Sequence, residues 1–267
     1  MSSWEFFDSI RCINLVSRPD RYEIANSLFH ERQIPVEFYK AVKHPNGGLQ
    51  GCFESHVNVI REAYEAGCEN VLIFEDDLVT TSKFDESLLA EAIDFMKANN
   101  DWDLFYLGAF PEIKHHKTSR LTGDERESFP NIYKLHSLCG HAYVVSRRFM
   151  EKFKDAQFTG IPLDYIYVEN NHSYAVYPSL FAQGASVSDN NGNVAMGSFN
   201  IDTMPKVKQT FFRAMEMYGY HVNAPAIWIP IILLVIWAAL VFMYPQYRIF
   251  HISFLVMIIL LMLAVAK

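Results

Sequence analysis

The chain has 267 residues, of which 51% are apolar and 20% are charged, and its formal net charge is −7. An excess of acidic residues argues against a grip on a nucleic-acid backbone, which needs clustered Lys and Arg. All 30 acidic residues and all but two of the 23 Lys and Arg residues precede Ala226. An acidic part, long enough for one sizeable α/β domain, is therefore followed by a nearly uncharged segment.

The first half of the acidic part alternates between short apolar runs and segments with helical spacing. We predict strands at 11–16, 34–42 and 71–74, and helices at 20–32 and 51–66. Asp20 is placed to cap the first of these helices. The run VLIF at 71–74 is wholly apolar, which is typical of a strand buried on both faces of a sheet.

The second half continues this alternation. We predict a helix at 83–99, strands at 103–108, 141–146 and 174–177, a short helix at 147–154 and a polar loop at 111–130. Alternating strands and helices with apolar strands indicate an α/β open sheet with helices on both faces.

Two long uncharged runs follow the acidic part. Residues 226–244 and 249–266 each approach the roughly 20 helical residues that cross a bilayer. The four residues between them suit a tight turn, so this pattern predicts a C-terminal transmembrane helical hairpin. A hairpin buried in a soluble domain is the alternative. Basic residues flank the two outer ends more than the turn, which predicts that the acidic domain lies on the cytosolic side of a membrane.

Three adjacent carboxylates, Glu75, Asp76 and Asp77, follow the apolar run at 71–74. Ligands of open α/β sheets bind at the carboxyl ends of the strands. Alternation along a strand would direct Glu75 and Asp77 to one face and Asp76 to the other. The repulsion among these groups would be relieved by Mn²⁺ or Mg²⁺, which prefer oxygen ligands. A solvated acidic turn is the alternative.

Several motifs in a fixed order carry a family resemblance. They are INLVSRPDR (13–21), GCFESH (51–56), VLIFEDD (71–77), GHAYVVS (140–146) and PLD (162–164), followed by PSLFAQ (178–183). Together they resemble glycosyltransferase family 25, which includes lipopolysaccharide and collagen galactosyltransferases. The resemblance covers about residues 10–190, and an ordered set of motifs is far more specific than any one of them.

The resemblance implies a fold and an activity. The fold is a GT-A-like, nucleotide-sugar-binding catalytic domain at 1–200, joined by a stalk at 201–225 to the hairpin at 226–267. The activity is an inverting, metal-dependent transfer of a hexose such as galactose. The donor would be a nucleotide-diphosphate sugar, such as a UDP-sugar, and the acceptor a glycan, a protein or a lipid-linked molecule.

The resemblance also implies roles for particular residues. Glu75 and Asp77 would bind the divalent metal, Mn²⁺ or Mg²⁺. Asp164 would be the catalytic base that accepts the proton of the acceptor hydroxyl. The donor and nucleotide pocket would be formed by Asn14, Leu15, Arg18, Asp20, Arg21, Ser55, His56, Asp76, Gly140 and Tyr143. His172 is the nearest candidate for a late histidine ligand of the metal.

Each assignment has a plainer alternative. The Arg and Asp residues at 18–21 could form a surface charge network, His56 could be a hydrogen-bonded structural residue, and Asp164 could cap a helix after Pro162. The four cysteines form no CxxC pair and are interpreted as buried reduced thiols. At the level of the whole chain, a catalytically inactive membrane-anchored scaffold and a metal-dependent phosphohydrolase are the rival functions.

Overall fold

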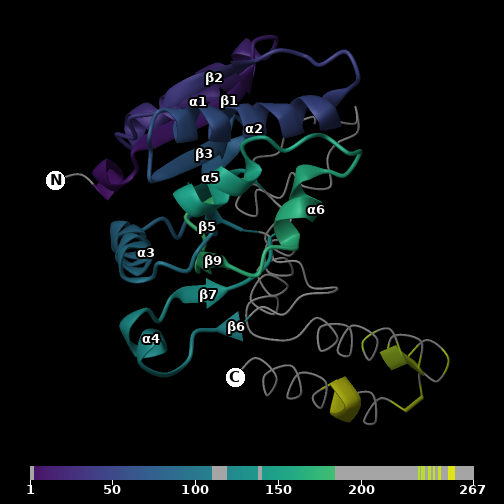
Figure 1. Ribbon diagram of the computed structural model, residues 1–267. Helices are drawn as coiled ribbons and strands as arrows, with labels where there is room; N and C mark the ends of the chain where they lie inside the picture. Colours follow the sequence, from purple (N-terminus) through teal and green to yellow (C-terminus); the bar gives the residue numbers. More distant parts are fainter. Residues whose placement is uncertain are drawn as a thin grey trace.

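The computed structural model describes residues 3–109, 119–137 and 140–183, together with single residues and a short run between 234 and 255. The described part contains an eight-stranded mixed sheet and a two-stranded ribbon (Figure 1). In spatial order the sheet consists of β2 (Glu37–Ala41), β1 (Ser9–Leu15), β3 (Asn70–Glu75), β8 (Ala142–Ser146), β5 (Leu104–Gly108), β9 (Ser173–Val176), β7 (Ile132–Lys134) and β6 (Ser119–Arg120). The ribbon pairs β4 (Leu78–Thr80) with β10 (Phe181–Gln183).

Strand direction determines which loops meet at the candidate site. β1 runs parallel to both β2 and β3, whereas β8 runs antiparallel to β3. The carboxyl ends of β1, β2 and β3 therefore meet the amino end of β8 at one edge of the sheet. The backbone N–H of Glu75 donates to the carbonyl of His141 at 3.1 Å, which joins β3 to the segment before β8 at that edge.

Helices cover both faces of the sheet, as the sequence predicts. α1 (Pro19–Glu31) and α3 (Glu86–Ala98) pack on one face, and α2 (Gly48–Glu65), α5 (Arg147–Phe153) and α6 (Leu163–Val168) pack on the other (Figure 1). Two further short helices are η1 (Ser3–Phe6) and α4 (Gly123–Ser128).

Strand β3 shows how this two-sided core is built. Leu72 and Phe74 join the hydrophobic cluster on the face of α1 and α3, while Val71 and Ile73 join the cluster on the face of α2 and α5. All four side chains are fully buried. Their alternation places Glu75, the last residue of the strand, on the α2 face.

The predicted strands and helices are confirmed within a few residues, with three differences. β2 begins only at Glu37, because Pro35 has no N–H to donate to a ladder. Part of the predicted loop at 111–130 forms β6 and α4. The prediction that Asp20 caps a helix is wrong: α1 begins at Pro19 with Arg18 at the N-cap position, so Asp20 lies in its first turn.

Most of the predicted hairpin at 226–267 lies outside the described residues, as do the stalk at 201–225 and the domain boundary at 200. Within that segment the described residues at 234–243 and 252–255 are helical, and Gln246 lies in a turn. Nowhere in the described part of the chain does a single helix reach the length and apolar character that a membrane crossing requires.

Candidate active site

A pocket of about 130 Å³ opens at the sheet edge where β1, β2 and β3 end. The start of α2 forms the opposite wall. Seven residues that the sequence assigns to the site line this pocket: Leu15, Arg21, Ser55, His56, Glu75, Asp76 and Asp77. The pocket lies at the carboxyl ends of the parallel strands, which is where ligands of open α/β sheets bind.

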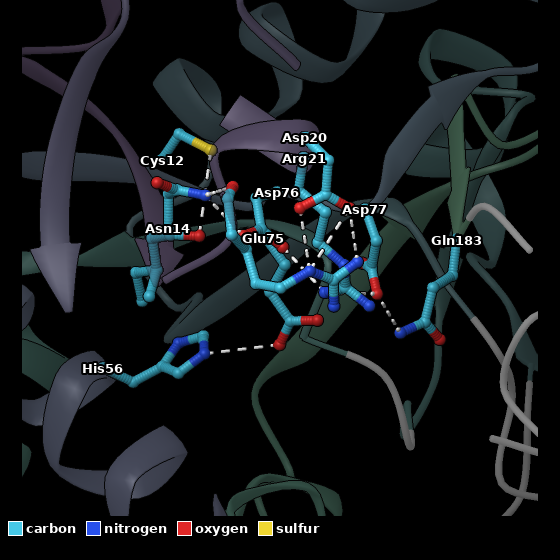
Figure 2. A network of polar contacts seen from close by, with 11 residues as sticks. Cys12, Asn14, Asp20, Arg21, His56, Glu75, Asp76, Asp77 and Gln183 are labelled. Atoms are coloured by element: carbon cyan, nitrogen blue, oxygen red, sulfur yellow. Dashed lines mark hydrogen bonds and ion pairs between the residues drawn. The ribbon is translucent and has the colours of Figure 1, made fainter. Parts of the chain in front are cut away.

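Arg21 and Asn14 hold the two aspartates of the acidic motif. Arg21 Nη1 lies 2.8 Å from Asp76 Oδ1 and 3.4 Å from Asp77 Oδ2, and Asn14 Nδ2 donates to Asp76 Oδ2 at 2.7 Å. Gln183, the last residue of β10, donates a hydrogen bond of 3.3 Å from its Nε2 to Asp77 Oδ2 (Figure 2). A motif near the amino terminus and the motif after β3 thus form one polar network.

The arrangement of the three carboxylates differs from strict alternation. Asp76 and Asp77 share Arg21, which comes from the α1 face, whereas Glu75 points toward His56 of α2 (Figure 2). The reason is that β3 ends at Glu75, so Asp76 and Asp77 belong to a turn. The period-two rule applies only within a strand.

His56 and Tyr143 support Glu75 from the helical side. His56 Nε2 lies 3.3 Å from Glu75 Oε1, and its Nδ1 lies 2.7 Å from the hydroxyl of Tyr143. Tyr143 in turn lies 3.1 Å from the hydroxyl of Tyr167. Because His56 and both tyrosines are buried, this chain fixes the imidazole ring in one orientation.

The pKa values of the acidic groups record their crowding. Burial and the charge of Glu75 raise the pKa of Asp77 to about 7, although Arg21 opposes the shift. Burial also raises the pKa of Asp76, again against Arg21. Burial would raise the pKa of Glu75 too, but the hydrogen bond and charge of His56, with the charges of His141 and Arg21, lower it.

These residues fit a divalent cation. The side chains of Glu75 and Asp77 retain only 26% and 11% of their exposure, so water does not fully screen their repulsion. Arg21 is the basic residue that the described contacts place against the acidic motif, and one guanidinium cannot balance three carboxylates. Burial, and second the charge of Glu75, raise the pKa of Asp77 to about 7, and a bound cation would offset both causes.

Asp164 lies near this network without lining the pocket. It sits in the first turn of α6, whose N-cap is Pro162, so the alternative role as the cap is not what the structure shows. Burial and the charge of Glu75 raise the pKa of Asp164 to about 8. The charge of Glu75 therefore acts on Asp164, whose role as the catalytic base stays a prediction.

Several other residues predicted to bind the donor make contacts with other parts of the protein. Arg18 forms a bidentate pair with Asp20 at the surface, at 2.9 and 2.8 Å, and neither residue lines the pocket. For these two the charge-network alternative describes the structure. Ser55 donates to the carbonyl of Gly51 while lining the pocket. A Cβ on Gly140 would lie 3.7 Å from Glu75 Oε1, an ordinary contact distance, so this residue packs beside the network without having to be glycine.

The candidate late histidine, His172, is far from the site. It pairs with Asp101 where β9 begins, at the edge of the sheet opposite Glu75. Besides His56, His141 lies beside the acidic motif: it is buried, and desolvation lowers its pKa although the charge of Glu75 acts in the opposite direction. A Cβ on Gly108 would clash with the His141 ring, so close packing holds this side chain in place.

Sequence reasoning missed several pocket residues, among them Cys52, Lys43 and His44. Cys52 was grouped with the buried thiols, but it is partly exposed and lines the pocket. Its position four residues before His56 on one helix is the signal that could have revealed it, because such residues share a helix face. Lys43 follows the end of β2, the third parallel strand at this edge.

Comparison with known proteins is consistent with this site. The profile of glycosyltransferase family 25, described as an LPS biosynthesis protein family, matches residues 46–167. That segment contains the start of α2, the acidic motif and Asp164, and it begins after β1 and α1. The resemblance at 13–21 therefore lies outside the matched residues.

The similar proteins include a named galactosyltransferase, a relative described as inactive and a solved structure. Procollagen galactosyltransferase 2 of Mus musculus is 26% identical over 210 residues, which cover 66% of this chain and 32% of that protein. Inactive glycosyltransferase 25 family member 3 of Homo sapiens is 29% identical over 38% of this chain and 22% of its own. The solved structure of A197 from STIV covers 68% of this chain and 87% of its own at 12% identity, and its TM-score of 0.42 is too low to support an argument.

The chain spans about a third of the length of the procollagen galactosyltransferases that it matches. The matched segment nevertheless holds the proposed metal ligands, the proposed base and the pocket wall formed by α2. Over these residues the chain is similar to glycosyltransferase family 25, and the procollagen galactosyltransferases are among its distant relatives.

Proposed function

We propose that this chain is a metal-dependent, inverting glycosyltransferase that moves a hexose, with galactose favoured, from a UDP-sugar to an acceptor hydroxyl. The observation that carries the proposal is the meeting of Glu75, Asp76 and Asp77 with Arg21 at a pocket, with Asp164 in the field of Glu75. The preference for galactose rests on the names of the distant homologues.

The donor side of the site would be organised by the acidic motif. Glu75 and Asp77 would hold the cation, which when bound stabilises the negative charge that develops on a nucleoside diphosphate leaving group. Arg21 and Asn14 fix the orientation of Asp76, and Arg21 limits the repulsion between the two aspartates. The pocket of about 130 Å³ is smaller than a typical ligand pocket and accommodates only part of a nucleotide sugar.

The acceptor side would depend on Asp164. In an inverting transfer the acceptor oxygen forms a bond to the anomeric carbon while the bond from that carbon to the diphosphate oxygen breaks. Asp164 accepts the proton that the acceptor hydroxyl loses, and the electron pair of the broken bond leaves with the diphosphate. A base positioned in this way contributes about 10²- to 10⁴-fold to the rate.

Residues 226–267 are proposed to anchor this domain to a membrane beside a glycan, protein or lipid-linked acceptor, with the domain on the cytosolic side. The support is the sequence: two uncharged runs separated by a short polar turn, with basic residues at the outer ends. Protease protection in sealed vesicles tests the orientation. Digestion of the domain from the cytosolic face supports it, and protection there with digestion from the other face contradicts it.

A turnover screen tests the proposed activity. The full chain in detergent is incubated with nucleotide sugars, Mn²⁺ and candidate acceptors, and release of nucleoside diphosphate is measured. The proposal expects metal-dependent, acceptor-dependent release that Asp77→Ala abolishes. The matched control is Asp94→Asn, which changes an exposed carboxylate on α3.

The rival functions give different results in the same screen. A phosphohydrolase would release inorganic phosphate from simple phosphate esters without an acceptor. An inactive scaffold, like the human relative described as inactive, would release neither product.

A further inference from the structure

Three different metal-binding side chains converge on the wall of the pocket. Cys52 and His56 lie on α2, four residues apart, and Glu75 ends β3. One ligand atom from each of the three lies within 4.8 Å of the other two. Figure 2 shows the ring of His56 facing the carboxylate of Glu75. A thiol, an imidazole and a carboxylate are the donors that Zn²⁺ takes in proteins, whereas Mn²⁺ and Mg²⁺ prefer oxygen alone.

The spacing of these atoms suits a small tetrahedral ion. Zinc binds imidazole nitrogen and carboxylate oxygen at about 2.0–2.2 Å, so two such ligands at tetrahedral angles lie about 3.3 Å apart. The separation of His56 Nε2 and Glu75 Oε1 is 3.3 Å. The sulfur atom of Cys52 lies within 4.8 Å of the other two ligand atoms, and a change of its side-chain rotamer would bring it to the ion.

The histidine is oriented as metal-binding histidines commonly are. Its Nδ1 makes the 2.7 Å hydrogen bond with the Tyr143 hydroxyl, so Nε2 is the atom that faces Glu75. An outer partner of this kind fixes the ring and the tautomer, and its loss typically weakens metal binding about 10- to 100-fold. Cys52 and Glu75 both line the open pocket, which gives an ion a path to the three ligands.

We propose that Cys52, His56 and Glu75 form a binding site for a thiophilic divalent cation such as Zn²⁺, with a fourth position open to the pocket. Binding at this site does not depend on the proposed glycosyltransferase activity. One consequence does rest on it: since Glu75 is also a proposed ligand of the catalytic metal, a thiophilic ion would remove that carboxylate from the donor site and inhibit transfer.

Cobalt spectroscopy tests the site without any measurement of turnover. Co²⁺ is titrated into the full chain in detergent under reducing conditions, and the thiolate-to-cobalt charge-transfer absorption in the near ultraviolet is recorded. We expect one equivalent of Co²⁺ to produce this absorption, and Zn²⁺ to remove it by displacement. Cys52→Ser should lose the absorption entirely, while Tyr143→Phe should keep it with about 10- to 100-fold weaker binding.

Cys68→Ser is the matched control, because it removes a partly exposed thiol that is not among the pocket residues, and it should leave the cobalt absorption unchanged. Circular dichroism melting of each variant confirms that it is folded. Absence of the absorption in the unmodified chain, or its persistence in folded Cys52→Ser, would overturn the proposal.

An inhibition arm separates this inference from the proposed function. If the chain transfers sugar, Zn²⁺ should inhibit the unmodified chain and should inhibit Cys52→Ser at least tenfold less strongly, at equal Mn²⁺. If no donor is turned over, the proposed function fails while the cobalt absorption still decides the site.

Discussion

Asn14 donates a hydrogen bond of 2.7 Å to Asp76, a residue 62 positions later in the chain, and both side chains are buried. The contact links the end of β1 to the turn after β3, and these two strands are parallel neighbours in the sheet. Arg21, from the helix that follows β1, reaches the same aspartate. The position of the acidic motif is therefore fixed by β1 and α1 as well as by its own strand, β3.

The pairing of Arg21 with the two aspartates predicts a large loss of stability when the guanidinium is removed. Arg21→Met should lower the free energy of unfolding by about 3 kcal/mol at pH 7, since it leaves buried carboxylates without their cation. Urea unfolding measures this value. Arg18→Met, which removes one half of a surface pair, should change it by less than about 1 kcal/mol. If the two substitutions lowered the free energy of unfolding equally, the pairing of Arg21 with buried carboxylates would be contradicted.

Substitution of Asp77 should change the free energy of unfolding in the opposite direction. Its pKa is about 7 in the folded chain against an ordinary 3.8, so between these values the folded state binds more protons than the unfolded state. Stability from this group is present below about pH 4 and is lost as the pH rises toward 7. Without metal, Asp77→Asn should raise the free energy of unfolding at pH 7.5 by about 1–2 kcal/mol and flatten its fall between pH 4 and 7.

The same Asp77→Asn variant should lose the stabilisation that Mn²⁺ gives the unmodified chain. Thermal melts with and without Mn²⁺ measure this difference. A variant that is less stable than the parent in the absence of metal would show that the carboxylate is not strained by its neighbours.

Substitution of Asp164 should lower the rate of transfer with little change in donor binding. Asp164→Asn should lower kcat about 10²- to 10⁴-fold, because the amide cannot accept the acceptor proton, while the Kd for UDP changes less than threefold. Steady-state kinetics and titration calorimetry separate the two effects. Glu169→Gln, a change to an exposed carboxylate at the end of the same helix, should leave both values near those of the parent.

The pH dependence of kcat/KM should report the same group. The pKa of Asp164 is raised to about 8, first by burial and second by the charge of Glu75. A cation bound at Glu75 offsets the second cause, so the acid limb of the metal-loaded enzyme should have its midpoint below 8 but well above 3.8. Asp164→Asn should remove the limb. A profile that is flat from pH 5 to 8 would contradict the role of this residue as the base.

Much of the fold could be predicted because the local signals agree with one another. The apolar run at 71–74 has no polar residue to face water, so it must form a strand covered on both faces, and Leu72 and Val71 do pack in the two opposite clusters. Apolar runs of this kind predict the strands, and helical spacing predicts the helices. Their alternation indicates a sheet covered by helices on both faces. The antiparallel direction of β8 and the small elements β6 and α4 have no comparable local signal, because they depend on contacts made far along the chain.

The site could be predicted in part for a similar reason. Glu75 and Asp77 were found from the edge of a strand, where sequence position implies location. The pairing of Arg18 with Asp20 and the position of His172 away from the pocket depend on side-chain directions and strand order that no local spacing determines. Periodicity within a strand also failed at Asp76 and Asp77, since the strand had already ended.

Titration calorimetry of the full chain with UDP, in the presence and absence of Mn²⁺, most directly tests the claim that Glu75 and Asp77 bind a cation that holds a nucleoside diphosphate. UDP should bind at least tenfold more tightly with Mn²⁺ than without it, and Asp77→Ala should lose this difference. Equal affinity with and without the metal, or a metal effect that survives in Asp77→Ala, would contradict it.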